Sequence, residues 1–550
     1  MKFTRKLPLA ILASVLLVFT LLASCDSSSS DKDKGPTVID VFSFNDFHGT
    51  VDKSASGSNP GADRFTAIVQ KLMSENPNST LLCAGDSYQG SPLSNIFEGE
   101  PVSDMIKYLG VKYSAVGNHE FDWGSSLISK FATDGGITFL AANIVLKGTN
   151  TSPVFCEPYA IITIGGKKIG IIGLTTTSVP TLVKAEYVED YDFKEPGPWL
   201  DDLINDLKTD KGCNLVIALT HMGATQNNDT KVVIGEAANL ATTCPGFDAI
   251  IAGHSHSLVA GVVNGIPIVQ GNYNGRGLGR LTITIDGDAV SIEPKCYVQN
   301  DMNLDGILPN DPLVVNEDVK AIIAGYNNEI GPYFAEVVGK YGTAITDRAS
   351  QAVWATKVVW DYIERETDEN YILVQNDGGW RSTNNAYAAT EDVTLGYLYT
   401  LMPFDNEIVL LEMQGKDILY MLNEANLTGY ASVAGAYCDG GTFNEDAAAG
   451  RLGWNGGTWK LTDGTEIANN TTVYKVACND FMVTGGDNYP FPGSSQGNTA
   501  GVVKIKDHTF MGVPLRDAMI EELQYRAANA MLPSEATFFL AWLGSFARAY

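Results

Sequence analysis

Short apolar runs alternate with amphipathic segments along the first half of the chain. Seven runs between Val38 and Gly279 are rich in β-branched and apolar residues and predict buried strands: TVIDVFSF, TLLCAGD, YSAVGN, KIGIIGL, NLVIALTHMG, DAIIAGHSH and IPIVQGN. Segments such as RFTAIVQKLMSEN and GPWLDDLINDLKT carry apolar residues at helical spacing between these runs. Buried strands that alternate with helices predict an α/β layered fold, in which ligand sites gather at the carboxyl ends of the strands.

The second half of the chain has elements of its own. YILVQNDGG, EIVLLEMQG and VYKVACNDF predict strands, and ATKVVWDYIERE, GKDILYMLNEA and LRDAMIEELQYRAA predict helices. A chain of 550 residues is too long for one hydrophobic core, so two large domains are expected. Residues 311–336 have the pattern of a helix that joins them.

The N-terminus has the pattern of an export signal. Lys2, Arg5 and Lys6 precede an apolar stretch over residues 7–22 that is short for a membrane-spanning helix. The ending LASC resembles a bacterial lipoprotein box, which would make Cys25 the lipidated first residue of an exported protein, held on the periplasmic or cell-surface side. The polar, Ser-rich stretch that follows reads as a flexible tether. We therefore predict a signal peptide (1–24), a tether (25–36), a first domain (37–310), a linker helix (311–336) and a second domain (337–550).

Charge and cysteine usage limit the partners. The chain has 64 acidic and 37 basic residues, which argues against a nucleic-acid partner because such partners need a basic surface. A small phosphorylated ligand remains compatible with a locally positive site, the lipid anchor is the expected membrane contact, and the oligomeric state is left open. No CxxC or zinc-finger spacing occurs, which argues against a thiolate metal site. Cys213 and Cys244 each precede a predicted strand and could pair if those strands are neighbours.

Five of the six histidines follow predicted strands, together with acidic and amide residues. Asp46 and His48, in DFHG, are two residues apart and would point to the same side of an extended chain, as would the two histidines of GHSH. Imidazole and carboxylate ligands suit zinc, manganese or iron(II), and a carboxylate such as Asp86 can bridge two ions. Seven ligands with one shared fit two metal sites: Asp46, His48, Asp86, Asn118, His221, His254 and His256.

These motifs, in this order, resemble those of the calcineurin-like metallophosphoesterases, and in particular the exported 5′-nucleotidase family. The second half supports the narrower resemblance through NDGGWR, LMPFDN and NDFMVTGGDNYP, so that the match spans roughly residues 38–530. The resemblance implies an αββα sandwich as the catalytic domain, followed by the linker helix and a C-terminal α/β substrate-binding domain. It also implies a small-molecule nucleotide as the substrate and hydrolysis of its phosphoester, with nucleotide sugars as a further candidate substrate.

The resemblance assigns roles to individual residues. It implies two divalent ions, zinc, manganese or similar. His119 would face the phosphoryl group, oriented by Asp122. One ion would be held by Asp46, His48, Asp86 and His256, and the other by Asp86, Asn118, His221 and His254.

The resemblance also implies a substrate pocket in the second domain. Phe404 and Phe481 match the positions whose rings sandwich the base, a contact that tolerates any base. Asp487 would accept hydrogen bonds from ribose hydroxyls, and Arg381 and Arg348 would grip phosphate or a substrate carboxylate. The implied substrate-binding residues are Arg348, Asn376, Arg381, Phe404, Phe481 and Asp487.

Two departures from the family pattern leave the substrate open. Asp377 and Trp380 interrupt the loop that usually carries three glycines before its Arg. A 2′,3′-cyclic-nucleotide 2′-phosphodiesterase/3′-nucleotidase would share the same motifs, and acceptance of a cyclic ester would separate the two enzymes. A non-catalytic ligand-binding surface lipoprotein would be expected to lack a metal ligand, and none is missing here.

Overall fold

The computed structural model describes eleven stretches of the chain. Cys25, the predicted signal peptide and most of the predicted tether lie outside them, as do residues 311–314 of the predicted linker. The described residues are 35–53, 59–298, 315–381, 385–423, 431–440, 442–446, 451–455, 457–483, 485–490, 502–505 and 513–529. Among these residues, no helix combines the length and the apolar character needed to cross a membrane.

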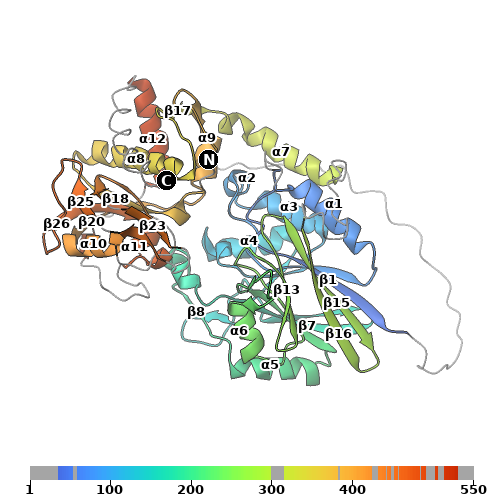
Figure 1. Ribbon diagram of the computed structural model, residues 1–550. Coiled ribbons are helices and arrows are strands. Elements are labelled where there is room, and N and C mark those ends of the chain that lie inside the picture. The colour runs from blue at the N-terminus through green and yellow to red at the C-terminus, as the bar shows by residue number, and fades with distance from the viewer. Residues whose placement is uncertain are drawn as a thin grey trace, which may run out of the picture.

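Two six-stranded sheets face each other in the first domain (Figure 1). The first has the order β16-β15-β1-β2-β3-β4 and the second the order β13-β14-β12-β9-β7-β6. The first is built from β1 (Thr37–Phe44), β2 (Ser79–Cys83), β3 (Tyr113–Ala115), β4 (Thr138–Leu140), β15 (Gly277–Asp286) and β16 (Ala289–Val298). The second is built from β6 (Tyr159–Ile164), β7 (Lys167–Thr175), β9 (Leu215–His221), β12 (Ala249–Ile251), β13 (Leu258–Val263) and β14 (Ile266–Gly271).

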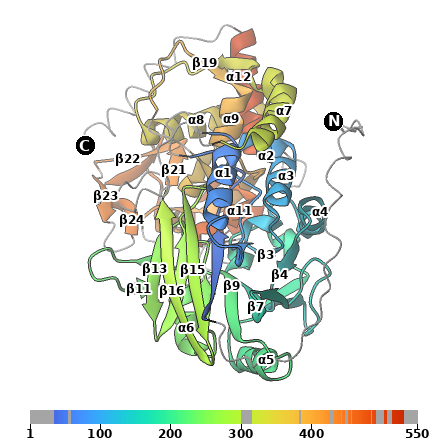
Figure 2. The same cartoon turned by 90° about the vertical axis from the view of Figure 1, so that its right-hand side faces the viewer.

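Strand β1 explains why the apolar runs are nearly continuous. Ile39 and Val41 point into the layer between the sheets, whereas Phe42 and Phe44 pack beneath the helices on the outer face. Both faces of the strand are therefore buried. Helices α1 (Ala62–Met73), α3 (Glu100–Leu109) and α4 (Ser125–Gly135) cover the first sheet, and α5 (Pro198–Thr209) and α6 (Glu236–Thr243) cover the second. The predicted αββα sandwich is confirmed, and Figure 2 shows its strands from the side.

Short elements complete the first domain. A five-residue helix, α2 (Pro92–Ile96), begins at Ser91, whose side chain accepts a hydrogen bond from the Ser94 amide. Two small two-stranded sheets lie outside the sandwich, β5 (Ile144–Leu146) with β8 (Tyr191–Phe193) and β10 (Thr225–Gln226) with β11 (Val233–Ile234). Three 3₁₀ turns are η1 (His119–Phe121), η2 (Val179–Thr181) and η3 (Ala185–Tyr187).

The second domain is a five-stranded sheet between two layers of helices. Its order is β21-β18-β26-β20-β27, from β18 (Ile372–Asn376), β20 (Ile408–Gln414), β21 (Ala431–Ala434), β26 (Val473–Asn479) and β27 (Val502–Ile505). One face packs against α8 (Arg348–Thr367), α9 (Leu395–Leu401) and α12 (Leu515–Ala528), and the other against α10 (Gly415–Asn423) and α11 (Asp480–Val483). Smaller elements are β17 (Val337–Lys340), β19 (Asp392–Thr394), β22 (Ala436–Asp439), β23 (Thr442–Asp446), β24 (Arg451–Asn455), β25 (Thr458–Leu461), η4 (Asp377–Gly379) and η5 (Gly486–Asn488).

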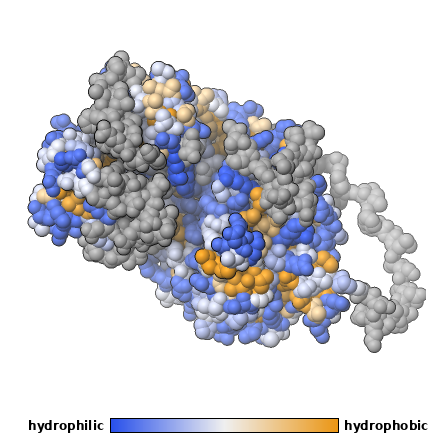
Figure 3. Space-filling view, in the orientation of Figure 1, coloured by the Kyte–Doolittle hydropathy of each residue, from blue (hydrophilic) through white to orange (hydrophobic). Residues whose placement is uncertain are grey.

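Helix α7 (Glu317–Phe334) connects the two domains along one side of the molecule (Figure 1). Asn316 caps its first turn by accepting a hydrogen bond from the Val319 amide. Tyr326 donates a hydrogen bond to Asp104 of α3, so most of the helix rests on the first domain. In the space-filling view, hydrophilic residues line the recess between the domains (Figure 3).

All seven cysteines of the described residues are buried, and no disulfide joins any two of them. Strands β9 and β12 are neighbours, as the possible pairing of Cys213 with Cys244 requires. The two thiols nevertheless remain unbonded, so that pairing is not formed. Burial raises the pKa of the Cys83 thiol to about 12, and the side chain behaves as a core residue.

Candidate active site

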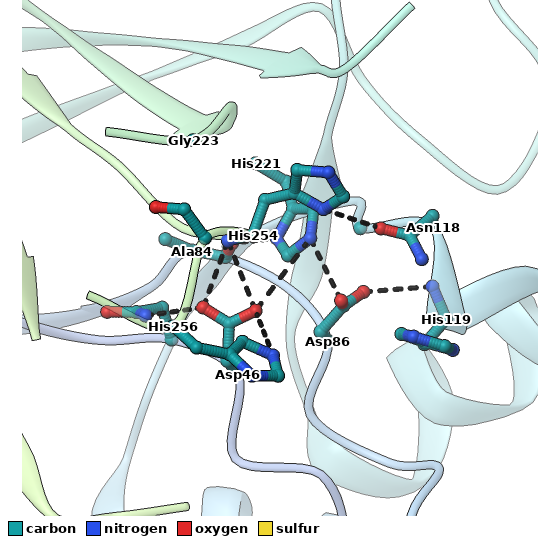
Figure 4. A network of polar contacts seen from close by, with 12 residues as sticks. Asp46, Ala84, Asp86, Asn118, His119, His221, Gly223, His254 and His256 are labelled. Carbon is teal, nitrogen blue, oxygen red and sulfur yellow. Dashed lines mark hydrogen bonds and ion pairs between the residues drawn. The ribbon is translucent and has the colours of Figure 1, made fainter. Parts of the chain in front are cut away.

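The polar clusters of the first domain converge because parallel strands end at one edge of the sandwich. Strands β1, β2 and β3 run parallel in the first sheet, and β9 and β12 run parallel in the second. The residues that follow their carboxyl ends meet between the sheets (Figure 4). Side chains from five strand ends therefore share one site.

The local backbone differs from the extended chain expected for DFHG and GHSH. Asp46 and His48 have φ of 49° each, and His254 and His256 have φ of 81° and 51°. These are left-handed conformations, which non-glycine residues adopt rarely and at a cost. The expectation of same-side positions on a strand is wrong, because β12 already ends at Ile251 and tight turns aim these side chains instead.

One group of ligand atoms consists of Asp46, His48 and His256. Their ligand atoms lie within 4.8 Å of one another. The Asp46 carboxylate is fully buried and accepts hydrogen bonds from Asn45 (2.5 Å) and from the backbone amide of His254 (3.0 Å). His48 Nδ1 lies 3.2 Å from the Gln89 carbonyl, which leaves Nε2 directed at His256 Nε2, 2.9 Å away. Two imidazole nitrogens aimed at one point suit a shared cation.

A second group consists of Asp86, His221 and His254, whose ligand atoms also lie within 4.8 Å of one another. His221 Nδ1 lies 2.7 Å from the Ala84 carbonyl, which fixes the ring and presents Nε2 to the site. That Nε2 is buried and lacks a hydrogen-bond partner, although an Asp86 oxygen lies 2.9 Å away. Asn118 Oδ1 lies 3.1 Å from His254 Nδ1. A buried imidazole nitrogen that faces a carboxylate oxygen fits a metal ligand.

The charge states of these groups follow from burial and from the two carboxylates. Burial lowers the pKa of His254 to about 4 and that of His48 well below its usual value, and partial burial together with His119 and Arg381 lowers the pKa of the more exposed His256. These imidazoles are therefore neutral at pH 7, which is the form that binds metals. Burial opposes the charged form of His221 as well, but Asp86 and Asp46 outweigh it and raise its pKa to about 10. The electrostatics at His221 thus favour positive charge.

His119 and Asp122 form a separate pair at the edge of the site. His119 begins η1, and its Nδ1 lies 2.6 Å from Asp122 Oδ2. Its backbone amide donates a hydrogen bond to Asp86 Oδ1 at 2.9 Å. Burial lowers the pKa of His119, but Asp122 and then Asp86 raise it further, to about 9. The ring is held as an imidazolium that can donate from Nε2.

A pocket of about 250 Å³ runs from this site into the second domain. Asp86, His119, His254 and His256 line one end, and loops of the second domain line the other. Those loops contribute Asn376, Arg381, Phe404, Phe481 and Asp487. The pocket therefore joins the candidate ligands to most of the residues expected to contact substrate.

Phe404 of the second domain lies beside His119, and Arg381 lies over Phe404. The ring centroids of Phe404 and His119 are 6.0 Å apart at an interplanar angle of 22°. The Arg381 guanidinium lies over the Phe404 ring, 4.9 Å from its centroid. On the facing loop, a side chain at Gly486 would overlap the Phe481 ring, so the glycine allows that ring to lie against the backbone.

Asp487 is oriented by a buried amide. Asn376 Nδ2 donates to Asp487 Oδ2 at 2.6 Å, and Asn376 Oδ1 accepts from Asn479 Nδ2 at 2.9 Å and from Gln375 Nε2 at 3.2 Å. Asn376 is 2% exposed and ends β18, whereas Asp487 has a left-handed φ of 51°. The network holds the carboxylate of Asp487 at the pocket wall.

Comparisons with known protein families match the two domains of the chain separately. Residues 40–258 match the calcineurin-like phosphoesterase family, and residues 338–493 match the 5′-nucleotidase C-terminal domain. The chain belongs to the calcineurin-like phosphoesterases with a 5′-nucleotidase C-terminal domain. This membership makes it a metal-dependent phosphoester hydrolase.

Relatives match over most of this calcineurin-like phosphoesterase. The cell wall protein Lmo0130 of Listeria monocytogenes is 29% identical over 546 residues, which cover 89% of this chain and 68% of the relative. A 5′-nucleotidase of Vibrio cholerae is 25% identical over 565 residues, which cover 94% of this chain and 99% of the relative. The crystal structure of a 5′-nucleotidase precursor from Thermus thermophilus shares the fold, with a TM-score of 0.66 and 21% identity over 89% of this chain and 96% of that chain.

Trp380, one of the two unusual residues in the substrate loop of this phosphoesterase, belongs to the core. Trp380 is 1% exposed, packs in the core of the second domain and donates its indole N–H to Ser432 at 3.2 Å. The side chain of Asp377 lies outside the described part. Arg348 does not line the pocket of Phe404. It lines a second hollow of about 950 Å³, on the other side of His256 and Arg381.

The sequence analysis missed residues that orient the candidate metal ligands or line the pocket of the phosphoesterase. Glu120 is 1% exposed, and its carboxylate accepts hydrogen bonds from the backbone amides of Asp86 (2.9 Å), Ser87 (2.9 Å) and Gly117 (2.6 Å). It thereby ties the loop after β2 to the loop after β3. A buried acidic residue inside GNHEFD was the available signal. Lys184 also lines the pocket, and no motif marks it.

Proposed function

We propose that this hydrolase releases phosphate from nucleoside 5′-monophosphates. The observation that carries the proposal is the pocket that joins Asp86, His254 and His256 to Phe404, Phe481 and Asp487 across two domains. Its first-domain end has the donor atoms for cations and a phosphoryl group. Its second-domain end offers aromatic rings for a base and a carboxylate for ribose hydroxyls.

Two divalent ions, zinc, manganese or similar, fit the donor set. Asp46, His48, Asp86 and His256 would hold one, and Asp86, Asn118, His221 and His254 the other. The groups of close ligand atoms that contain Asp46 and His221 agree with this division, and a third group joins His48 and Asp86 to His119. Such ions, when bound, lower the pKa of water and neutralise charge on phosphoryl oxygens. The buried Nε2 of His221, which has no hydrogen-bond partner, and the facing imidazoles of His48 and His256 support this assignment.

His119 would act on the phosphoryl group, with Asp122 as its positioning partner. An imidazolium at the pocket edge can donate a hydrogen bond to a phosphoryl oxygen, or a proton to the leaving oxygen. Asp122 fixes the ring through Nδ1 and favours the charged form. Nε2 is left as the donor toward the pocket.

The second domain would supply substrate recognition. Phe404 and Phe481 would stack on the base, Asp487 would accept hydrogen bonds from the ribose, and Arg381 would contact the phosphate. Asn376 would act through Asp487, which its side-chain amide orients at 2.6 Å. The second hollow beside Arg348 offers space for a group beyond the phosphate, as in a nucleotide sugar.

The expected location of this hydrolase is outside the cytoplasm. The charged and apolar N-terminal segment and the LASC ending support export and lipidation at Cys25, and one relative is a cell wall protein. Mass spectrometry of the membrane-extracted protein should find a chain that begins at a lipid-modified Cys25, whereas a Cys25→Ser chain should carry no lipid.

The test uses purified residues 26–550, stripped of metal and then supplied with manganese or zinc. Phosphate release is followed from AMP, a nucleotide sugar, 3′-AMP and 2′,3′-cyclic AMP. Metal-dependent hydrolysis of AMP is the expected result. Hydrolysis of only the 3′ and cyclic substrates would replace the proposal with the 2′,3′-cyclic-nucleotide phosphodiesterase alternative. Inactivity on all four substrates with metal bound would refute both.

A further inference from the structure

The two aromatic loops of the pocket are both held by one lysine of the catalytic domain. Lys184 lies between η2 and η3, in the segment that follows β7, and it lines the pocket together with Leu182, Val183 and Tyr187. Its ammonium group lies 2.9 Å from the carboxylate of Asp480 and donates a hydrogen bond to the carbonyl of Asp405 at 3.1 Å. Both partners belong to the second domain.

Each partner is the chain neighbour of a pocket aromatic residue. Asp405 directly follows Phe404, and Asp480 directly precedes Phe481. The Asp480 carboxylate also accepts a hydrogen bond from the Phe481 amide at 2.9 Å and from the Glu407 amide at 3.1 Å. Lys184 therefore contacts the backbone next to Phe404 directly and contacts the backbone of Phe481 through the Asp480 carboxylate.

The other side of Phe404 is fixed by the catalytic domain as well. Asn95 of α2 donates to the Pro403 carbonyl at 2.8 Å, and Gln89 donates to the same oxygen at 3.5 Å. The carbonyl groups before and after Phe404 thus accept hydrogen bonds from the first domain. Arg516 and Leu515 of the second domain also hold this loop, through the Met402 and Asn406 carbonyls, so docking fixes the loop from the first domain in addition.

The ion pair between Lys184 and Asp480 is partly buried, which strengthens it. The side chains of Lys184 and Asp480 are 16% and 25% exposed, so water screens the pair less than it screens a surface pair. Burial lowers the pKa of Lys184, but the adjacent Asp480 raises it above its usual value, so the lysine stays charged. Charge-assisted hydrogen bonds are the stronger kind.

We propose that Lys184 is a positioning residue that docks the catalytic domain onto both aromatic loops and so prearranges Phe404 and Phe481 for the substrate base. The inference rests on the proposed function in that it takes a nucleoside as the ligand of these rings. Prearranged contacts strengthen binding because their ordering cost is met before the ligand arrives. The lysine therefore affects substrates that carry a base more strongly than base-free phosphoesters, which do not contact the two rings.

The test compares Lys184→Met with Lys184→Arg in the metal-loaded protein, using AMP and ribose 5-phosphate. Lys184→Met should lower kcat/KM for AMP about tenfold, mainly through KM, because it removes a partly buried charge-assisted pair. The loss on ribose 5-phosphate should be several-fold smaller than the loss on AMP, and Lys184→Arg should recover most of both. Lys130→Met is the matched control, because Lys130 pairs with Asp134 at 2.8 Å within α4, away from the pocket.

Two results would overturn the inference. One is an unchanged KM for AMP in Lys184→Met, and the other is an equal loss on AMP and on ribose 5-phosphate. A wild-type protein inactive on AMP would refute the proposed function instead, so docking is also measured without a substrate.

Spin labels at Lys211→Cys and Asp463→Cys, one exposed residue in each domain, report the interdomain distance. Lys184→Met should broaden its distribution, and an identical distribution would overturn the docking role.

Discussion

Asn376→Asp changes a single contact of the pocket while keeping the shape of the side chain. The amide oxygen that accepts hydrogen bonds from Asn479 and Gln375 is retained as a carboxylate oxygen. The amide nitrogen that donates to Asp487 at 2.6 Å becomes a second oxygen. The substitution therefore preserves the packing behind β18 and removes the support for Asp487.

The size of the effect follows from that contact. A hydrogen bond to a charged acceptor contributes roughly 1.5–3 kcal/mol, and each 1.4 kcal/mol is about tenfold in an equilibrium constant. If Asp487 binds ribose hydroxyls, losing its orientation should raise KM for AMP about 10- to 100-fold. Two carboxylates this close also repel, so they share one proton when the pH is low enough. The defect should therefore be largest at neutral and alkaline pH and should shrink as the pH falls.

Steady-state kinetics with AMP and 2′,3′-dideoxy-AMP provide the assay. The dideoxy substrate lacks the hydroxyls, so Asn376→Asp should leave its KM unchanged. Asn205→Asp, at an exposed position of α5, controls for the added negative charge. A rise in KM of equal size for both substrates would mean that the variant disturbs the whole pocket, and the assigned role of Asp487 would be refuted.

Three further predictions concern the metal site. His119→Ala should keep its bound metal in calorimetric titration yet lose at least about a hundredfold in turnover, the usual contribution of a proton donor; undiminished turnover would remove His119 from the mechanism. Chelation should abolish phosphate release and lower the midpoint of thermal unfolding. A ligand that binds only the folded state stabilises it by roughly 2.7 kcal/mol when its free concentration is a hundred times its Kd. Activity that survives complete chelation would contradict the two-ion assignment. Glu120→Ala should weaken metal binding about 10- to 100-fold, the usual cost of losing a group that orients metal ligands, because three backbone amides near Asp86 lose their hydrogen-bond acceptor. Glu75→Ala, at an exposed position, is the control. Equal metal affinity in both variants would argue against this role of Glu120.

The sandwich could be predicted because burial on both faces leaves a plain signal. Ile39 and Val41 face the second sheet while Phe42 and Phe44 face helices, so β1 has no solvent side and reads as one apolar run. The hairpin of β15 and β16 was missed, since its outer strand is half exposed. Its alternating residues around an Asp-Gly turn were the available signal.

The candidate ligands could be found from the sequence, but their geometry could not. Motif order and strand ends picked out residues that the fold brings together. How the turns aim Asp46 and His256 depends on left-handed backbone angles that no periodicity encodes. The position of Lys184 was equally inaccessible, because its partners lie more than two hundred residues further along the chain. Contacts across a domain boundary leave no local pattern.

The left-handed histidines have an evolutionary consequence. His48 and His256 occupy backbone positions that glycine would fill without strain, at a saving of roughly 1–2 kcal/mol per residue. Loss of such a ligand would therefore abolish metal binding without unfolding the domain, and the variant should melt no lower than the metal-free parent. Descendants of this hydrolase can drift into catalytically silent binding proteins more easily than into unfolded ones. In such a lineage, a glycine at position 48 or 256 would mark the loss of catalysis.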